Sequence, residues 1–334
     1  MSDNSGTIAL SPEASKARHR AKIQAIVRTV GMAPVLILLA IVFQMLSDRF
    51  LSLQNLAIVA QQASVNMVLA AGMTFVILSG GIDLSVGSIL AAASMVALIV
   101  SNIPDISWMA IPAGILTGLG IGAVNGALVA FIRLPPFIVT LGALTAVRGF
   151  ARLLGSDQTV FNASLPYAVI GSGSIFGVPW LVVIAFGVIL LSWFILRRTV
   201  LGVHIYSVGG NEAAARLAGI KVPLVFLFVY AVSGAFSGIG AIMQTARLYA
   251  ANGLQLGQSY ELDAIAAVIL GGTSFVGGIG SIWGTFVGAL IIAVLSNGLV
   301  LIGVSDIWQF IIKGLVIIGA VALDRYRLAG SART

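Results

Sequence analysis

The sequence has no cysteine and little that could do chemistry on a substrate. Without thiols, the chain can form neither a disulfide nor a thiolate metal site. The two histidines, His19 and His204, belong to no HExxH pattern, and no pair of carboxylates suggests hydrolysis. No GxxxxGK[ST] pattern occurs, because none of the lysines follows a glycine. These absences argue against an enzyme, a metalloprotein and a P-loop ATPase, and we expect no metal site and no cofactor.

Charge is also scarce, and this excludes an ordinary soluble domain. Charged residues make up 9% of the 334 residues, whereas a soluble domain carries about a quarter. Hydrophobic residues reach 59%, and the mean hydropathy is +1.08. Repeated apolar runs of roughly 20 residues are each long enough to cross a bilayer. The sequence therefore predicts an all-α, polytopic membrane protein.

Ten apolar runs predict about ten transmembrane helices. The run at 137–154 is the weakest, because it carries Arg148 and Arg152. The last three runs include two that are separated only by a glycine-rich segment, so one of them is a candidate for a broken or re-entrant helix. The runs lie at residues 30–47, 56–78, 86–102, 108–131, 137–154, 178–196, 223–246, 261–275, 280–302 and 306–324.

The net charge of +7 follows from the membrane and predicts no nucleic-acid partner. With ten spans, most lysines and arginines fall in segments on one side, which the positive-inside rule makes cytoplasmic. Both termini are therefore predicted to be cytoplasmic. The expected organisation is a basic cytoplasmic tail over 1–29, a single transmembrane domain over 30–324 with a cytoplasmic loop at 197–222, and a second tail over 325–334.

Two glycine-rich hairpins resemble each other. FVILSGGIDLSVGSIL covers residues 75–90, and AVILGGTSFVGGIGSIW covers residues 267–283. Both contain Val-Ile-Leu, a glycine pair, a short turn and Gly-Ser-Ile, and an Asn-Gly pair follows each, at Asn125 and Asn297. Two related halves would explain this, and in such transporters the pathway lies near the interface between repeats. Chance similarity between glycine-rich membrane helices is the alternative.

A polar stretch at 208–222 interrupts the apolar runs. Asn211 can cap a short helix that begins at Glu212, and Gly219 can end it. The stretch falls on the predicted cytoplasmic side. Because the chain has no ATP-binding sequence of its own, such a surface would be needed to dock a partner, and it is the main pointer to function.

Few polar residues lie inside the apolar runs, where each is costly in lipid. We consider them candidates for a solute pathway or for gating, although hydrogen bonding between helices is the more ordinary role. Asp83 can instead cap the helix that follows it, and Lys313 needs a partner. No acidic residue is clearly central, which disfavours an ion-coupled carrier. The candidates are Asn66, Asp83, Asn125, Thr140, Arg148, Asn297 and Lys313.

Long motifs of this chain resemble the permease subunits of bacterial ribose-type sugar ABC importers. The resemblance covers nearly all of residues 30–324. The motifs are SGGIDLSVGSIL at 79–90, PPFIVTLGALTAVRG at 135–149, GGNEAAARLAGI at 209–220, YELDAIAAVILGGTSFVGG at 260–278 and SNGLVLIGVSDIWQFIIKG at 296–314.

This resemblance implies a permease in the bacterial inner membrane that pairs with a second copy as a homodimer. ABC ATPase subunits would dock on its cytoplasmic side, and a periplasmic sugar-binding protein would dock on the other. In the family, a polar loop fits a groove on the ATPase. Here the spacing differs from the broader importer pattern, so this assignment depends on the sugar-permease resemblance. It maps onto Gly209, Gly210, Asn211, Glu212, Ala213, Ala214 and Gly219.

The resemblance also implies transport of a monosaccharide, with ribose as the best single choice. The main alternative is another solute carried by the same machinery: another sugar, a polyol, an autoinducer sugar, a nucleoside or a branched-chain amino acid. An ion-coupled carrier and a purely structural membrane subunit fit less well. Selectivity in such importers lies mostly in the separate binding protein, so the permease sequence does not identify the sugar.

Overall fold

The computed structural model describes residues 32–331, so the predicted tail over 1–29 lies outside the described residues. Each of the ten apolar runs contains a helix: α2 (Ala33–Leu46), α3 (Leu53–Leu78), α4 (Val86–Ser101), α5 (Ala110–Ala130), α6 (Pro136–Leu154), α8 (Trp180–Arg198), α11 (Val222–Leu248), α12 (Tyr260–Leu270), α13 (Ile282–Leu301) and α14 (Asp306–Ser331). Shorter helices lie between them: η1 (Pro104–Met109), α7 (Val169–Ser172), α9 (Val200–Gly210) and α10 (Glu212–Leu217).

Six helical segments of the described chain are long and apolar enough to cross a membrane. α2 and α4 are shorter apolar helices, and the 11 residues of α12 rise only about 16 Å. The fold is therefore all-α and polytopic, as predicted, but its long helices are fewer than the ten apolar runs. The six are α3, η1 together with α5, α6, α8, α11 and α13.

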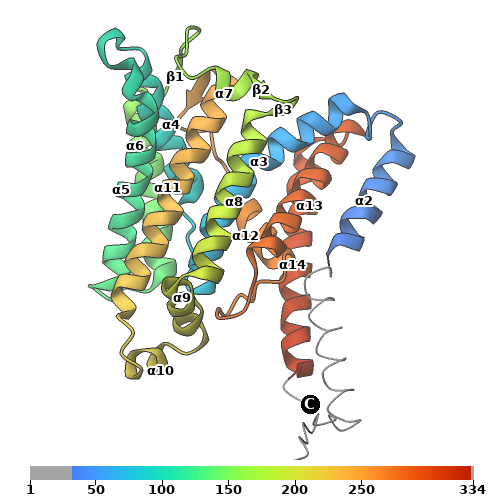
Figure 1. Cartoon of the computed structure of the whole chain (residues 1–334). Helices are drawn as coiled ribbons and strands as arrows, with labels where there is room; N and C mark the ends of the chain where they lie inside the picture. The colour runs from blue at the N-terminus through green and yellow to red at the C-terminus, as the bar shows by residue number, and fades with distance from the viewer. Residues whose placement is uncertain (1–31, 332–334) are drawn as a thin grey trace, which may run out of the picture.

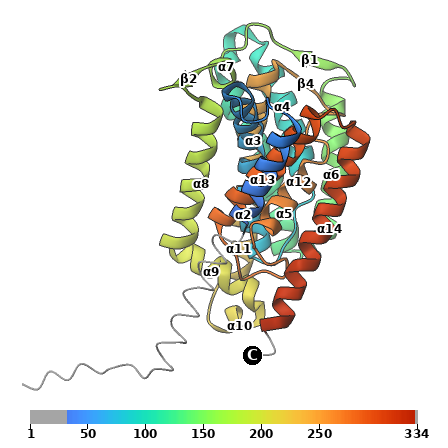
Figure 2. The same ribbon diagram turned by 90° about the vertical axis from the view of Figure 1, so that its right-hand side faces the viewer.

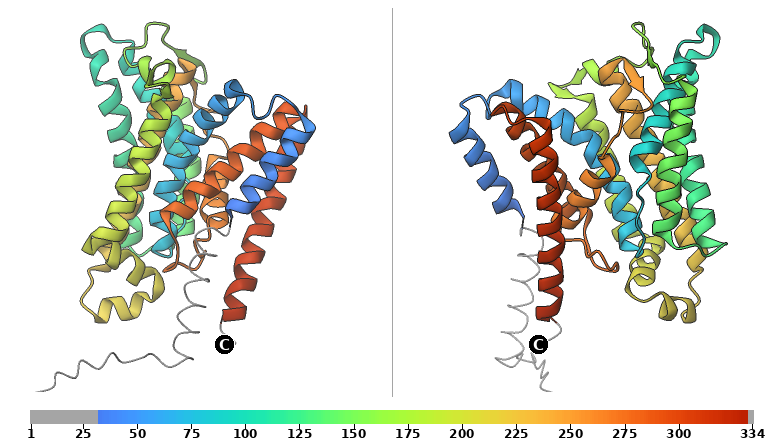
Figure 3. Two further views of the ribbon diagram at one scale, coloured as in Figure 1. Left: turned by 45° about the vertical axis from the view of Figure 1, so that its right-hand side comes forward. Right: turned by 180° about the vertical axis from the view of Figure 1, so that it is seen from behind.

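The bundle has two different ends (Figure 1). α10 lies at one end, which we call the α10 end. α7 lies at the opposite end, the α7 end, together with two short antiparallel pairs: β1 (Thr159–Phe161) with β4 (Ala250–Asn252), and β2 (Ser174–Ile175) with β3 (Val178–Pro179). α8 and α14 lie on opposite flanks (Figure 2). α2 and α14 lie at one edge of the bundle, near α13 (Figure 3).

α3 is the central helix of the bundle. From residue 63 to residue 78, every position except Asn66 is buried. A helix that is apolar on all sides is expected in the interior, and here its aromatic contacts face two turns of α11. The ring of Phe75 packs edge-on against Phe228 and Phe236, with centroids 6.3 Å apart in both pairs.

α5 and α11 approach each other closely through glycine. A Cβ atom on Gly118 or Gly122 of α5 would overlap backbone atoms of α11, and a Cβ on Gly234 of α11 would overlap α5 in return. Small residues at intervals of four permit this close approach of helix backbones.

Two non-helical segments interrupt the interior of the bundle. Residues 79–85 join α3 to α4, and residues 253–259 join β4 to α12. The segments meet where a Cβ on Gly87 would overlap the carbonyl oxygen of Gly257. Both glycines are buried, and α4 begins inside the protein, because Ser85 and Val86 at its start are buried as well. The predicted broken helix in the region 261–283 is confirmed as α12, and α4 is a second one.

Candidate functional site

The α10 end carries the stretch that the sequence singles out. The predicted short helix is confirmed: α10 begins after Asn211, whose side-chain oxygen accepts a hydrogen bond from the backbone N–H of Ala214 at 2.9 Å. This bond satisfies one of the free donors at a helix start. The helix ends at Gly219, which has φ +84°, a left-handed conformation that favours glycine.

α10 presents an exposed surface. Glu212 accepts a hydrogen bond from Arg216 one turn later, at 2.6 Å, and both side chains are about half exposed. Leu217 is 91% exposed, whereas Ala215 is buried against the rest of the protein. α10 therefore offers one apolar and two charged side chains for contact. Such an interaction of two exposed charges adds little stability, so this pair is not needed to hold the fold.

α9 connects α10 to the core. The sequence predicted only a cytoplasmic loop at 197–222 and did not predict this helix. A Cβ on Gly209 would overlap the carbonyl oxygen of Leu78, the last residue of α3. The same Leu78 oxygen accepts a hydrogen bond from the backbone N–H of Gly278 at 2.9 Å. Both predicted glycine hairpins therefore meet the end of α9 at one point. We call this point the glycine junction, and it consists of Leu78, Gly209 and Gly278.

The hollow beside the glycine junction has a volume of about 440 Å³. It is lined by the end of α5, the end of α9 and the start of α11, including Arg133, Asn211 and Arg216. The two arginines of this lining, with Arg197 and Arg198 at the end of α8, give the α10 end a positive charge.

The carboxylate of Asp83 holds the first non-helical segment in place. It accepts hydrogen bonds from the backbone N–H of Ser85 at 3.0 Å, from the Ser85 hydroxyl at 2.6 Å and from the Ser233 hydroxyl of α11 at 2.8 Å. Ser85 itself is the residue that precedes α4, and it makes no side-chain cap bond. Asp83 is completely buried, and it lies in the segment between two helices and not within a helix.

Three further side chains fix the same segment. The hydroxyls of Thr140 and Tyr230 donate to the carbonyl oxygen of Ile82, at 3.2 and 3.1 Å, and Asn125 donates to the Ser85 hydroxyl at 2.9 Å. Thr140 and Asn125 are buried. The candidates Asp83, Asn125 and Thr140 are thus brought together, as hydrogen-bond partners of one piece of backbone.

Arg148 holds the second non-helical segment in place through hydrogen bonds. Its guanidinium donates to four carbonyl oxygens between Gly253 and Gly257, at 2.5 to 3.4 Å. A guanidinium has five donors and no acceptor, so it suits a turn whose carbonyl oxygens point the same way. Asn297 lies elsewhere: its side-chain oxygen accepts a hydrogen bond from Asn55 of α3 at 2.9 Å. Asn297 therefore joins two helices, the ordinary role considered for it.

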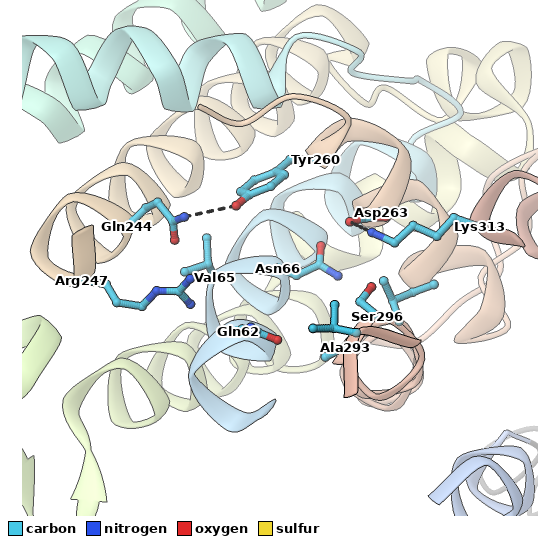
Figure 4. Close-up of a pocket in the computed structure, with 12 residues that line it drawn as sticks. Gln62, Val65, Asn66, Gln244, Arg247, Tyr260, Asp263, Ala293, Ser296 and Lys313 are labelled. Carbon is cyan, nitrogen blue, oxygen red and sulfur yellow. Dashed lines mark hydrogen bonds and ion pairs between the residues drawn. The ribbon is translucent and has the colours of Figure 1, made fainter. Parts of the chain in front are cut away.

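A polar cavity of about 230 Å³ lies between α3, α11, α12, α13 and α14. Of the seven candidates, Asn66 and Lys313 line it. Lys313 has the partner that it was predicted to need, since its ammonium group donates to the Asp263 carboxylate at 3.0 Å. Figure 4 shows Asn66 between this ion pair and a second pair, in which Gln244 donates to the Tyr260 hydroxyl at 3.2 Å.

Several cavity residues were not selected from the sequence. Gln62 and Gln244 stand inside apolar runs, so the rule that polar residues in spans are functional candidates could have found them. Tyr260 and Ser296 carry no such signal, because both residue types are common in membrane helices. Within residues 32–331, no group of three or more acidic or histidine side chains could hold a metal ion.

Comparison with known proteins places the chain in a family. A family model described as the permease component of the branched-chain amino acid transport system matches residues 55–321. No solved structure matches the chain at a significant level.

Three curated relatives cover most of the chain. The ribose import permease protein RbsC of Escherichia coli (strain K12) is 45% identical over 88% of this chain and 92% of its own length. RbsC of Haemophilus influenzae is 42% identical over 87% and 91%, and the D-allose transport system permease protein AlsC of E. coli is 39% identical over 87% and 90%. The chain therefore belongs to this family of transport-system permeases, and it is the membrane permease subunit of an ABC importer.

Proposed function

We propose that this chain forms the membrane pathway for a monosaccharide, ribose, which a periplasmic binding protein delivers and a separate ATPase drives inward. Two relatives with 42 and 45% identity are named ribose permeases, which supports the choice of ribose. In this proposal, two copies of the chain pair in the bacterial inner membrane, each contributing the ten helices as its spans, with the two halves of the chain related. Both termini and the α10 end face the cytoplasm.

The observation that carries the proposal is the link between α10 and the two interrupted helices. α10 is exposed, and it follows α9 directly. α9 ends at the glycine junction, in contact with the end of α3 and with the loop after α12. α3 leads into the segment before α4, so both interrupted helices are one connection away from α9. A displacement of α10 by the ATPase would therefore reach both.

ATP binding can change the pathway only if the ATPase binds α10 differently in the outward-open and inward-open states. Glu212, Arg216 and Leu217 are the exposed groups on α10 that such a contact would use. The backbone of α10 and its two ends would position these groups, through Gly209, Gly210, Asn211, Ala213, Ala214 and Gly219.

The experiment uses the permease reconstituted in proteoliposomes with its ATPase and binding protein. Uptake of radiolabelled D-ribose and ATP hydrolysis are measured together. Glu212→Lys reverses the charge of α10, and Gly219→Val imposes a β-branched residue on a left-handed backbone. We expect both to reduce ATP-driven uptake by about tenfold or more, and to leave insertion into the membrane unchanged.

The matched control is Asp105→Lys, the same type of charge reversal at an exposed position of η1, at the α7 end. It should retain uptake. Normal coupled uptake by Glu212→Lys and Gly219→Val would contradict the proposed role of α10. Competition by unlabelled D-allose, the sugar named for one relative, tests the choice of ribose, because stronger inhibition by D-allose than by D-ribose would overturn it.

A further inference from the structure

One residue in the wall of the polar cavity between α3 and α12 has an unsatisfied group. The side-chain oxygen of Asn66 is buried and has no hydrogen-bond partner within the described part of the chain. A buried acceptor without a donor costs about 1–3 kcal/mol, and in a span it cannot turn to water unless the cavity itself is wet. Four other helices each add donors or acceptors to the lining, which also contains apolar residues such as Val65 and Ile292.

Charge in the cavity is largely compensated. The ammonium group of Lys313 and the carboxylate of Asp263 pair with each other, and they are only 23% and 18% exposed. Arg247, in the last turn of α11, is the remaining cation among the lining residues that the structure describes. An anion without hydroxyl groups could pair with Arg247, but it would offer no hydrogen to the Asn66 oxygen.

A neutral, polyhydroxylated molecule fits this arrangement better. Each hydroxyl can donate one hydrogen bond and accept others, which matches amide groups from Asn66, Gln62 and Gln244 as well as the Tyr260 hydroxyl. The volume of about 230 Å³ is below the ~300 Å³ at which pockets for drug-sized ligands begin. The space is therefore suited to one small sugar ring.

The cavity lies where a solute would pass. Gln244 and Arg247 come from the last turns of α11, close to β4, so the cavity is in the half of the bundle near the α7 end. Its wall includes the first turn of α12, and the loop that follows α12 reaches the glycine junction. The 11 residues of α12 and the loop after it thus connect the cavity to the contact with α9.

We propose that this cavity is a binding site for the transported monosaccharide within the permease itself, with Asn66 and Gln62 as ligands to its hydroxyls. The proposal rests on the proposed function, since it takes the imported sugar as the ligand. Occupation would give the Asn66 oxygen the donor that it lacks. It would also place the sugar against α12, the helix that leads to the glycine junction.

The experiment compares two adjacent glutamines of α3. Gln62 lines the cavity, whereas its neighbour Gln61 does not. Asn66→Leu and Gln62→Leu remove hydrogen-bonding groups at nearly constant size, and Gln61→Leu makes the same chemical change beside them. Each variant is assembled with the ATPase in nanodiscs, and saturation-transfer NMR then measures direct contact with D-ribose, with D-ribose 5-phosphate as the anionic probe.

We expect wild type and Gln61→Leu to show saturation transfer to D-ribose, and the two cavity variants to lose it. Uptake by the cavity variants should fall about tenfold, the change expected from losing one hydrogen-bonding residue. ATP hydrolysis stimulated by the loaded binding protein should persist, unlike in Glu212→Lys. Intact saturation transfer and uptake in Asn66→Leu and Gln62→Leu, or stronger binding of D-ribose 5-phosphate, would overturn the inference.

Failure of the proposed function gives a different result. If the wild-type complex does not transport D-ribose but transports D-allose, ribose is the wrong sugar, and the comparison of Gln62→Leu with Gln61→Leu is repeated with D-allose. If wild type transports D-ribose and the cavity variants are normal, the function stands and the cavity site is wrong.

Discussion

At the scale of single residues, polar side chains that look alike in the sequence have three distinct roles. Asn297 is paired with Asn55, and it joins two helices. Asp83 accepts hydrogen bonds from Ser85 in a non-helical segment and from Ser233 of α11. Asn66 keeps an unpartnered oxygen, as far as the described residues go. Only the last of these has capacity left for a solute.

Asp83→Asn tests the structural role of the buried carboxylate. The amide would present an N–H₂ group to a cluster of donors, leaving one of them without an acceptor, so we expect a loss of about 1–3 kcal/mol in unfolding free energy. Thermal unfolding of the purified protein in detergent measures it. Asp48→Asn makes the same change at an exposed loop position and should unfold like wild type. Equal stability of both variants would exclude this role for Asp83.

At the scale of elements, α4 and α12 are short because a non-helical segment takes the place of further helical turns before each of them. Backbone polar groups cannot stay unpaired in a membrane, and the turns are satisfied by side chains from α5, α6 and α11. Arg148 alone supplies four hydrogen-bond contacts to the segment before α12. Interrupted helices near a polar site are a recurring feature of transporters.

Gly209→Ala tests the glycine junction at this scale. Its Cβ would overlap the Leu78 carbonyl oxygen, so α9 must move away from the end of α3. We expect coupled uptake to fall about tenfold or more, the result of a misplacement of this size. Gly187→Ala, on an exposed face of α8 with open space around it, is the control.

Gly187→Ala should transport normally and be slightly more stable, because alanine favours helices. Gel filtration and thermal unfolding show whether the Gly209→Ala protein is folded. A folded Gly209→Ala variant with full uptake would mean that the junction does not transmit motion from α9.

At the scale of the whole molecule, the described cations at the ends of α8 and α5 and on α10 gather at one end of the bundle. This is the arrangement that the positive-inside rule requires if the α10 end is cytoplasmic. It would place the polar cavity in the outer half, toward the binding protein, and α10 toward the ATPase.

The absence of cysteine makes this orientation directly testable. Phe176→Cys places a thiol at a fully exposed position in the turn between β2 and β3, and Leu217→Cys places one at a 91% exposed position on α10. With a maleimide that cannot cross membranes, we expect Phe176→Cys to react in cells whose outer membrane alone is permeabilised. Leu217→Cys should react only after the inner membrane is opened. The reverse pattern would invert the topology.

The sequence alone determined the class of protein and its local structure. Composition requires a membrane protein, because so many apolar residues would not be soluble, and the backbone must then form helices to satisfy its hydrogen bonds. The cap at Asn211 and the turn at Gly219 are also local, so they could be predicted from neighbouring residues. The glycine-rich segment at 275–280, which follows α12, marked this region as a candidate for a broken helix.

Only the tertiary structure decided which polar residues meet. Lys313 and Asp263 are 50 positions apart, and Ser233 is 150 positions from Asp83. No periodicity or local propensity fixes such pairs, because they depend on how helices pack after they have formed. For the same reason, the sequence could name Asn66 as a candidate, but only packing shows that it faces a polar cavity with its oxygen unpaired.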